Sequence, residues 1–135
     1  MSSPAVWADA KARIEAYAAA KPITVAWPNE PFDQPEPPAE WVAIEAYGDT
    51  ADAIELGRDA AWIEEGSIDM HVMVPRGRGI DTALQIRKEL SDLFRGIEPA
   101  AVTYSGASLH RLGPEQDDSL YRPLTLRVFY TYQSR

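Results

Sequence analysis

Only two histidines are available for acid–base or metal chemistry, and both fall in segments that alternate like strands. Asp69 and His71 are two residues apart and therefore share one face of a predicted strand, with Glu64 and Glu65 just upstream. Carboxylate and imidazole groups of this kind can hold a divalent metal. A metal site also needs a ligand from another element, and the sequence signals none. We therefore expect an ordinary polar sheet face.

A serine, a histidine and two aspartates allow a hydrolase triad to be drawn. Ser108 and His110 share a strand face, and Asp117 and Asp118 follow in the next loop. Acyl transfer needs its serine on a sharp, exposed turn beside an oxyanion hole, whereas this serine lies mid-strand without a G-x-S-x-G context. We expect no catalytic residues here.

The run from Arg76 to Gly79, Arg-Gly-Arg-Gly, precedes a predicted helix and so suggests a phosphate site, because a helix N-terminus presents unpaired N–H groups. Asp81 would repel a phosphate there, and no Gly-Lys-Ser/Thr follows. The glycines are better explained by the turn. We expect Arg76 and Arg78 to be solvated or to pair with acidic residues of a neighbouring copy, and we expect no cofactor and no metal.

Length and composition describe one acidic domain. The 135 residues include no cysteine and carry a net charge of -8. Such a chain can bury one core without disulfides, which fits assembly in a reducing cytoplasm. The charge argues against nucleic acid as a bound ligand, although an acidic wall lets DNA slide past. No segment resembles a signal peptide or a membrane span, so we expect no membrane partner.

The charge is unevenly distributed. Residues 1–75 carry 14 acidic and four basic side chains, a balance of -10, and the remainder carries +2. Unlike halves of one chain can meet head to tail in successive copies, and such a contact gives a ring when it closes. The alternative is a merely soluble acidic surface.

Two segments have apolar residues at helical spacing, Pro4–Ala20 and Ile80–Arg95. The expected buried stripes are Val6, Ala10, Ile14 and Tyr17 in the first, and Ala83, Ile86, Leu90, Leu93 and Phe94 in the second. The expected capping residues are Ser3 for the first helix and Asp81 or Thr82 for the second, which Gly96 ends.

Five further segments alternate like strands. They are Ile23–Trp27, Trp41–Tyr47, Ala60–Pro75 (one strand or a pair broken near Gly66), Ala101–Arg111 and Leu120–Gln133. An irregular loop is expected at about residues 48–60. This order predicts a single α+β domain over residues 1–135, with a mostly antiparallel sheet of about four to six strands and two helices packed on one face.

A proline-rich segment at about residues 28–39 is predicted to be a stiff extended arm, because its five prolines fix φ and remove donors. Its carboxylates Glu30, Asp33 and Glu36 are spaced along the arm, so no acid and base pair is implied. A long extended loop beside aromatic residues suits contact with another protein. The candidate interface residues are Trp27, Phe32, Trp41, Trp62, Arg76 and Arg78.

The layout resembles the small tail-terminator, or tail-completion, proteins of long-tailed phages and gene transfer agents. The likeness rests on the first helix ending near Lys21-Pro22, on VAWPNEPFDQP leading into EWVAIEAY, on IDMHVMVPRGRG feeding IDTALQIRKELSDLF, and on the closing strand YRPLTLRVFYTY. It covers nearly the whole chain. These are pattern-level similarities rather than invariant chemical motifs.

The resemblance implies a structural virion protein and no catalysis. It implies a ring homo-oligomer, usually a hexamer, that docks on the tail tube protein, stops tube growth and offers a surface to the head-tail connector or neck. DNA would pass through the channel without specific binding. The protein would reside at the head-proximal end of the tail, after assembly in the host cytoplasm.

Two alternatives remain open. One is a small-molecule-binding α+β domain with a pocket lined by Met70, Tyr104, Tyr130 and Trp62. The other is a different ring or adaptor protein of the head-tail joint.

Overall fold

A computed structural model describes residues 3–95, 100–114 and 120–134. Along the chain, the elements are α1 (Pro4–Ala20), β1 (Thr24–Ala26), β2 (Trp41–Ala53), β3 (Trp62–Pro75), α2 (Asp81–Asp92), β4 (Val102–Leu112) and β5 (Tyr121–Ser134). The two helices and the strand segments therefore follow the order that the sequence predicts.

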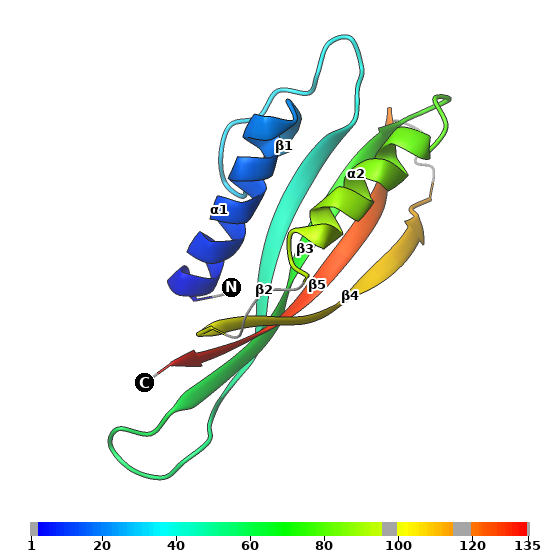
Figure 1. Ribbon diagram of the computed structural model, residues 1–135. Coiled ribbons are helices and arrows are strands. Elements are labelled where there is room, and N and C mark those ends of the chain that lie inside the picture. The colour runs from blue at the N-terminus through cyan, green and yellow to red at the C-terminus, as the bar shows by residue number, and fades with distance from the viewer. Residues whose placement is uncertain (1–2, 96–99, 115–119, 135) are drawn as a thin grey trace.

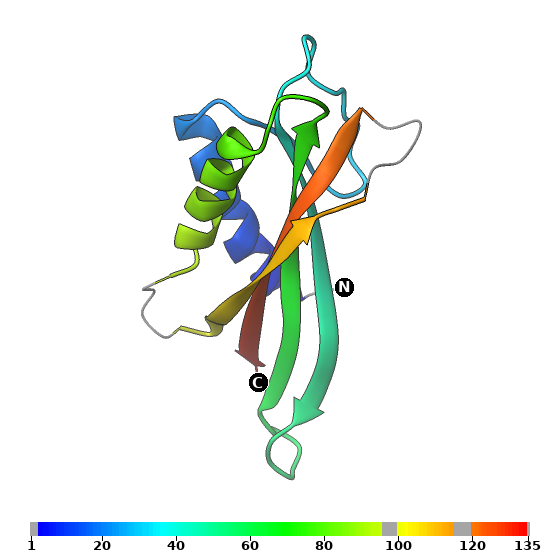
Figure 2. The ribbon, with the colours of Figure 1, turned by 90° about the vertical axis from the view of Figure 1, so that its right-hand side faces the viewer.

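The strands form one sheet with the order β1-β2-β3-β5-β4. Only the short β1–β2 pair is parallel, and the other three pairs are antiparallel. Both helices lie on the same face of this sheet, most clearly in the side view of Figure 2. The α+β prediction, with a mostly antiparallel sheet and two helices on one face, is confirmed.

The core lies between the helices and the inner face of β3 and β5. Period-2 alternation sends every second residue of each strand to this face. The buried residues of α1 are Val6, Ala10 and Ile14, those of α2 include Ala83, Ile86 and Leu90, and the sheet adds Ile68, Met70, Val72, Leu126 and Val128. The predicted apolar stripes of both helices are therefore confirmed, with Tyr17 and Leu93 only partly buried.

The structure places the N-cap of α1 at Ser3, as predicted, but the N-cap of α2 is neither Asp81 nor Thr82. The Ser3 hydroxyl accepts no hydrogen bond from the first turn of α1 and instead donates to the carboxylate of Glu64 on β3. Ile80 occupies the N-cap position of α2, so Asp81 lies inside the first turn, where its charge favours the helix dipole. Gly96, expected to end α2, lies outside the described residues.

The strands β2 and β3 form a long hairpin that extends beyond the helices (Figure 1). The prediction that β2 ends near Gly48 is wrong, because the strand passes a bulge between Gly48 and Thr50 and continues to Ala53. β3 is one strand, unbroken at Gly66. A β-carbon at Gly66 would lie 2.0 Å from the carbonyl oxygen of Tyr47, so glycine serves a close approach here and not a strand break.

Candidate functional site

Ser108 and His110, the serine and histidine of the triad that the sequence allows, lie close together on β4. The Ser108 hydroxyl lies 3.4 Å from Nε2 of His110, in the middle of β4 and away from any sharp turn. His110 is exposed. Asp117 and Asp118 lie outside the described residues. Ser108 is not on the sharp turn that a nucleophilic serine needs, and among the described residues no carboxylate orients the His110 ring.

The outer face of the sheet brings together three possible metal ligands. Oxygen atoms of Glu45 and Asp69 and a ring nitrogen of His71 all lie within 4.8 Å of one another. Sequence reasoning named two of them and missed Glu45, which comes from the neighbouring strand β2. The register pairs it directly with Asp69, a relation that no local pattern reveals. Glu64, which the sequence places just upstream, points to the helix face and accepts a hydrogen bond from the Tyr130 hydroxyl at 2.6 Å.

Protein groups already satisfy this cluster. Arg127 donates Nε and an Nη to the two carboxylate oxygens of Asp69, each at 2.9 Å. Nδ1 of His71 lies 2.7 Å from the Thr125 hydroxyl, and its Nε2 lies 3.3 Å from Glu45. Since a cation already occupies both oxygens of the buried Asp69, the cluster is better explained as a structural polar network than as a metal site.

The carboxylate of Glu45 is stabilised within the same network. The Tyr47 hydroxyl donates to it, which lowers the pKa of Glu45 despite partial burial, and His71 lowers that pKa further. The carboxylate is therefore held in its charged form. A group with a lowered pKa is a poor general base at neutral pH, so the chemistry available here is structural.

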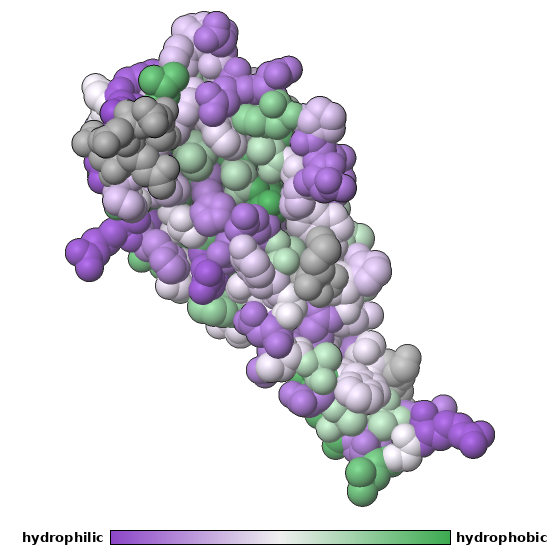
Figure 3. Space-filling view, turned by 180° about the vertical axis from the view of Figure 1, so that it is seen from behind, coloured by the Kyte–Doolittle hydropathy of each residue, from purple (hydrophilic) through white to green (hydrophobic). Residues whose placement is uncertain are grey.

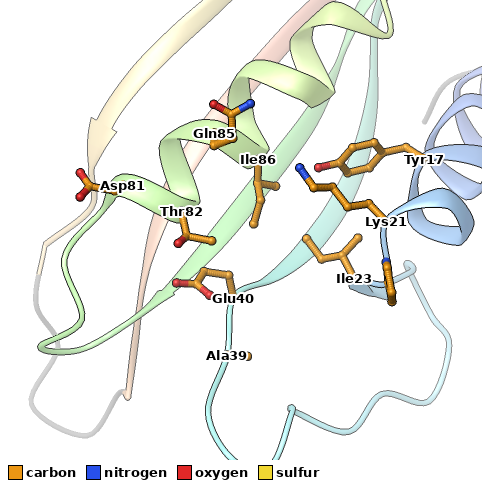
Figure 4. A pocket seen from close by; sticks show the side chains of 10 residues that line it. Tyr17, Lys21, Ile23, Ala39, Glu40, Asp81, Thr82, Gln85 and Ile86 are labelled. Atoms are coloured by element: carbon orange, nitrogen blue, oxygen red, sulfur yellow. The ribbon is translucent and has the colours of Figure 1, made fainter.

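A hollow with a volume of about 510 Å³ lies between the two helices. We call it the inter-helix groove (Figure 4). Tyr17 and Lys21, at the end of α1, point toward α2, and Ile23 and Ile86 give it an apolar wall. Glu40 lies at the opposite side, below the first turn of α2. The groove mixes apolar and oppositely charged groups and contains none of the four pocket residues expected from the sequence.

Those four residues do not surround a common cavity. Met70 is fully buried in the core, whereas Trp62 is 48% exposed near the end of the hairpin. Tyr104 lines a shallow hollow beside α2 and Tyr130 lines another near Glu65. The predicted small-molecule pocket is therefore wrong in its residues.

The aromatic residues beside the proline-rich arm contact the chain's own body. The Trp27 ring meets the Trp7 ring edge to face at 5.9 Å. The ring centroids of Phe32 and Trp41 lie 4.5 Å apart. Trp41 also contacts the Tyr121 ring and is only 8% exposed. The monomer thus leaves little of Trp41 accessible to a partner.

The two arginines of the turn differ in their surroundings. An Nη of Arg78 donates to the carbonyl oxygen of Pro38 at 2.7 Å, which ties the arm to the turn between β3 and α2. Arg76 is exposed and lines a small recess at the end of β3. The arm is therefore attached to its own subunit at Phe32 and at Pro38.

The hairpin is one of the places where large apolar side chains remain exposed. Ile54 is 52% exposed and Leu56 is completely exposed, as if in an extended peptide. Figure 3 shows the sheet face that points away from the helices, with the projecting hairpin at lower right ending in hydrophobic and hydrophilic side chains together. Exposed apolar groups at the end of a projecting element are typical of a surface that binds another protein.

Comparison with known proteins identifies the family. A family model described as phage tail terminator protein matches residues 5–107, about three quarters of the chain. The chain belongs to the phage tail terminator family.

The solved structures support the fold of this tail terminator. One of fourteen matching chains superposes with a TM-score of 0.66 at 21% identity, with 96% of each chain covered. At this identity the likeness concerns the fold alone. No curated protein matches the chain at a significant level.

Family membership gives the chain a structural role in the phage tail, and thus an association with the virion. Neither α1 nor α2 has the length and continuous hydrophobicity of a transmembrane helix.

Proposed function

We propose that this tail terminator forms a ring that caps the tail tube, ends tube growth and provides the surface to which the head and neck attach. The family match over residues 5–107 carries the proposal. The protein acts through the shape and charge of its surfaces and catalyses no reaction. Its place in the virion is the head-proximal end of the tail, reached after assembly in the host cytoplasm.

The ring consists of copies of this chain, six in number as the resemblance implies. A ring needs a heterologous contact, in which one surface of a copy meets a different surface of the next. The two ends of the sheet differ as such a contact requires. One end carries the acidic hairpin, with Asp49, Asp52 and Asp59 exposed, and the other carries Arg76 and Arg78.

The tube protein is the second partner, and β4 supports a contact with it. β4 is an edge strand of eleven residues, so one side of its backbone is not paired within the sheet. An open edge can accept a strand from another protein. Termination follows when one ring face matches the tube and the other lacks groups that a further tube subunit could pair with.

DNA is the third component that the ring must accommodate. The net charge of -8 gives copies of this chain a mainly acidic surface. An acidic channel wall repels phosphates, so DNA would pass the ring without being retained. Contact with the neck protein then depends on the face that points away from the tube.

Deleting the gene and measuring tail lengths by electron microscopy tests the proposed function. The expected result is overlong or headless tails, and normal length on supplying the chain in trans. Normal, head-bearing particles without the chain would contradict the proposal.

A small-molecule-binding role is a second candidate, and the inter-helix groove favours it. Its volume of about 510 Å³ falls in the range of ligand pockets, and Ile23 and Ile86 provide apolar contacts. A ligand there would raise the melting temperature of the purified chain in a metabolite panel. The change Ile86→Glu would remove that shift, and a panel without any shift would count against this role.

A different ring or adaptor of the head-tail joint would instead appear at another position in labelled particles.

A further inference from the structure

The end of the β2–β3 hairpin combines exposed apolar side chains with negative charge. We call residues 54–61 the hairpin tip. Leu56 is completely exposed and Ile54 is 52% exposed. Over residues 48–61 there are four acidic side chains, Asp49, Asp52, Glu55 and Asp59, against one basic side chain, Arg58. The tip therefore suits a receptor that is apolar at its centre and basic around it.

A recess with that character lies at the other end of β3. It has a volume of about 250 Å³, and its lining includes the apolar Val74, Ile80 and Leu112 together with Arg76 and Arg122. We call it the basic recess. Nε of Arg122 donates to the carbonyl oxygen of Gly113 at 2.7 Å, which fixes this guanidinium beside the apolar wall.

The tip and the basic recess cannot meet within one molecule. The tip precedes Trp62, at the start of β3, and the recess lies beside Pro75, at its end. The 14 residues of this strand span roughly 45 Å, at about 3.3 Å per residue. Any contact between the two surfaces therefore joins different copies, and it is heterologous.

The geometry points to insertion of the hairpin tip of one copy, led by Leu56, into the basic recess of the next copy. This inference rests on the proposed function, since it specifies the contact that would build the ring. Leu56 is buried between Val74, Ile80 and Leu112 of the neighbour, while the acidic side chains of the hairpin face Arg76 and Arg122.

The charges of the other described hollows fit an acidic tip less well. The inter-helix groove has two acidic residues in its lining, Glu40 and Asp81, against one basic residue, Lys21, and the hollow on the outer face is lined by Asp49 and Glu65. Both would repel the tip. The hollow between α2 and β4 has one basic residue, Arg95, against two in the basic recess.

The natural absence of cysteine allows a direct cross-linking test. Leu56→Cys protein is mixed with Ile80→Cys protein, assembled on tail tubes and oxidised under mild conditions. The controls replace Ile80→Cys with Thr82→Cys in the inter-helix groove or with Arg95→Cys in the hollow between α2 and β4. We expect a disulfide-linked dimer from the Ile80 mixture and little from either control. Equal coupling to a control, coupling only between two Leu56→Cys chains, or no coupling at all would overturn the inference.

A binding measurement provides an independent test that does not depend on disulfide geometry. Leu56→Ser removes the tip's leading side chain without touching the core, so the melting temperature should not change. Association between copies should weaken at least about tenfold, which corresponds to about 1.4 kcal/mol. Leu84→Ser is the matched control, because Leu84 is 38% exposed on α2 and lies outside the proposed contacts, and this variant should associate normally. Unchanged association of Leu56→Ser would contradict the inference.

Failure of the inference and failure of the proposed function give different results. If Leu56→Cys does not couple to Ile80→Cys while the chain still restores tail length, the capping role stands and the contact is wrong. If coupling occurs but deletion of the gene leaves normal tails, the contact stands and the capping role is wrong.

Discussion

Replacing Arg127 with methionine should strongly destabilise the fold, because it leaves the carboxylate of Asp69 buried without its counter-charge. Asp69 is 3% exposed, and both of its oxygens accept from Arg127 at 2.9 Å. Breaking a buried ion pair by removing one partner costs about 3–5 kcal/mol. The Arg127 side chain is 41% exposed, so water can partly replace it. We therefore expect the lower end, about 3 kcal/mol.

Urea unfolding followed by tryptophan fluorescence measures this loss. We expect the midpoint to fall with an unchanged slope, since the surface exposed on unfolding is the same. A double variant, Asp69→Leu with Arg127→Met, removes both charges and should recover most of the stability, because an apolar pair of similar volume is often neutral. Zn²⁺ should not raise the melting temperature of the wild type, in which Arg127 binds both oxygens of Asp69.

The exposed pair Lys88–Asp92 supplies the matched control. Its atoms also lie 2.9 Å apart, but the two side chains are 68% and 44% exposed. Lys88→Met should therefore cost less than about 0.5 kcal/mol. The reasoning would be refuted if Arg127→Met cost no more than Lys88→Met, or if the double variant were as unstable as Arg127→Met alone. A clear stabilisation of the wild type by Zn²⁺ would refute the assignment of this cluster as structural.

Two further predictions concern stability. Gly66→Ala should lower the unfolding free energy by several kcal/mol, on the order of 3 or more, because its β-carbon would overlap the Tyr47 carbonyl, whereas Gly106→Ala has nothing within 4 Å and should be nearly neutral. Equal effects in urea unfolding would contradict this explanation. Glu89 accepts from Lys21, Tyr17 and Gln85, which lowers its pKa to about 2. Its contribution, about 1 kcal/mol, is thus present above pH 4.5 and is lost as the pH falls toward 2, so Glu89→Gln should be less stable at neutral pH and match the wild type near pH 2. A stability difference between the two proteins that did not change with pH would count against it.

Local periodicity was sufficient to predict the helices and most strands. The stripe Ala83, Ile86 and Leu90 repeats at helical spacing, and Leu124 to Tyr130 alternates for a strand, so each segment specifies its own type. The structure of the caps was not predictable in this way. Ser3 is a favourable capping residue, but the carboxylate of Glu64, 61 residues away, competes for its hydroxyl.

The relations between distant segments were the least predictable. Glu45 joins Asp69 and His71 only because the register of β2 with β3 places it there, and that register depends on pairing over the whole hairpin. The role of Gly66 also depends on this register, and for that reason the sequence suggested only a possible break there. A glycine in an alternating segment usually weakens a strand, and only the bulge at Gly48, with the carbonyl of Tyr47, explains why a glycine is required.

The proline-rich arm and the hairpin differ in how much of their apolar surface the subunit itself covers. Sequence reasoning favoured the arm as the contact element, because prolines hold it extended beside Phe32 and Trp41. Yet the Phe32 ring contacts the Trp41 ring, and Arg78 donates to the carbonyl of Pro38, so the arm uses these groups within its own subunit. The hairpin offers no such internal partner for Leu56, which remains completely exposed. Burying that side chain becomes favourable only when another surface is supplied, so the hairpin gains more from assembly than the arm does.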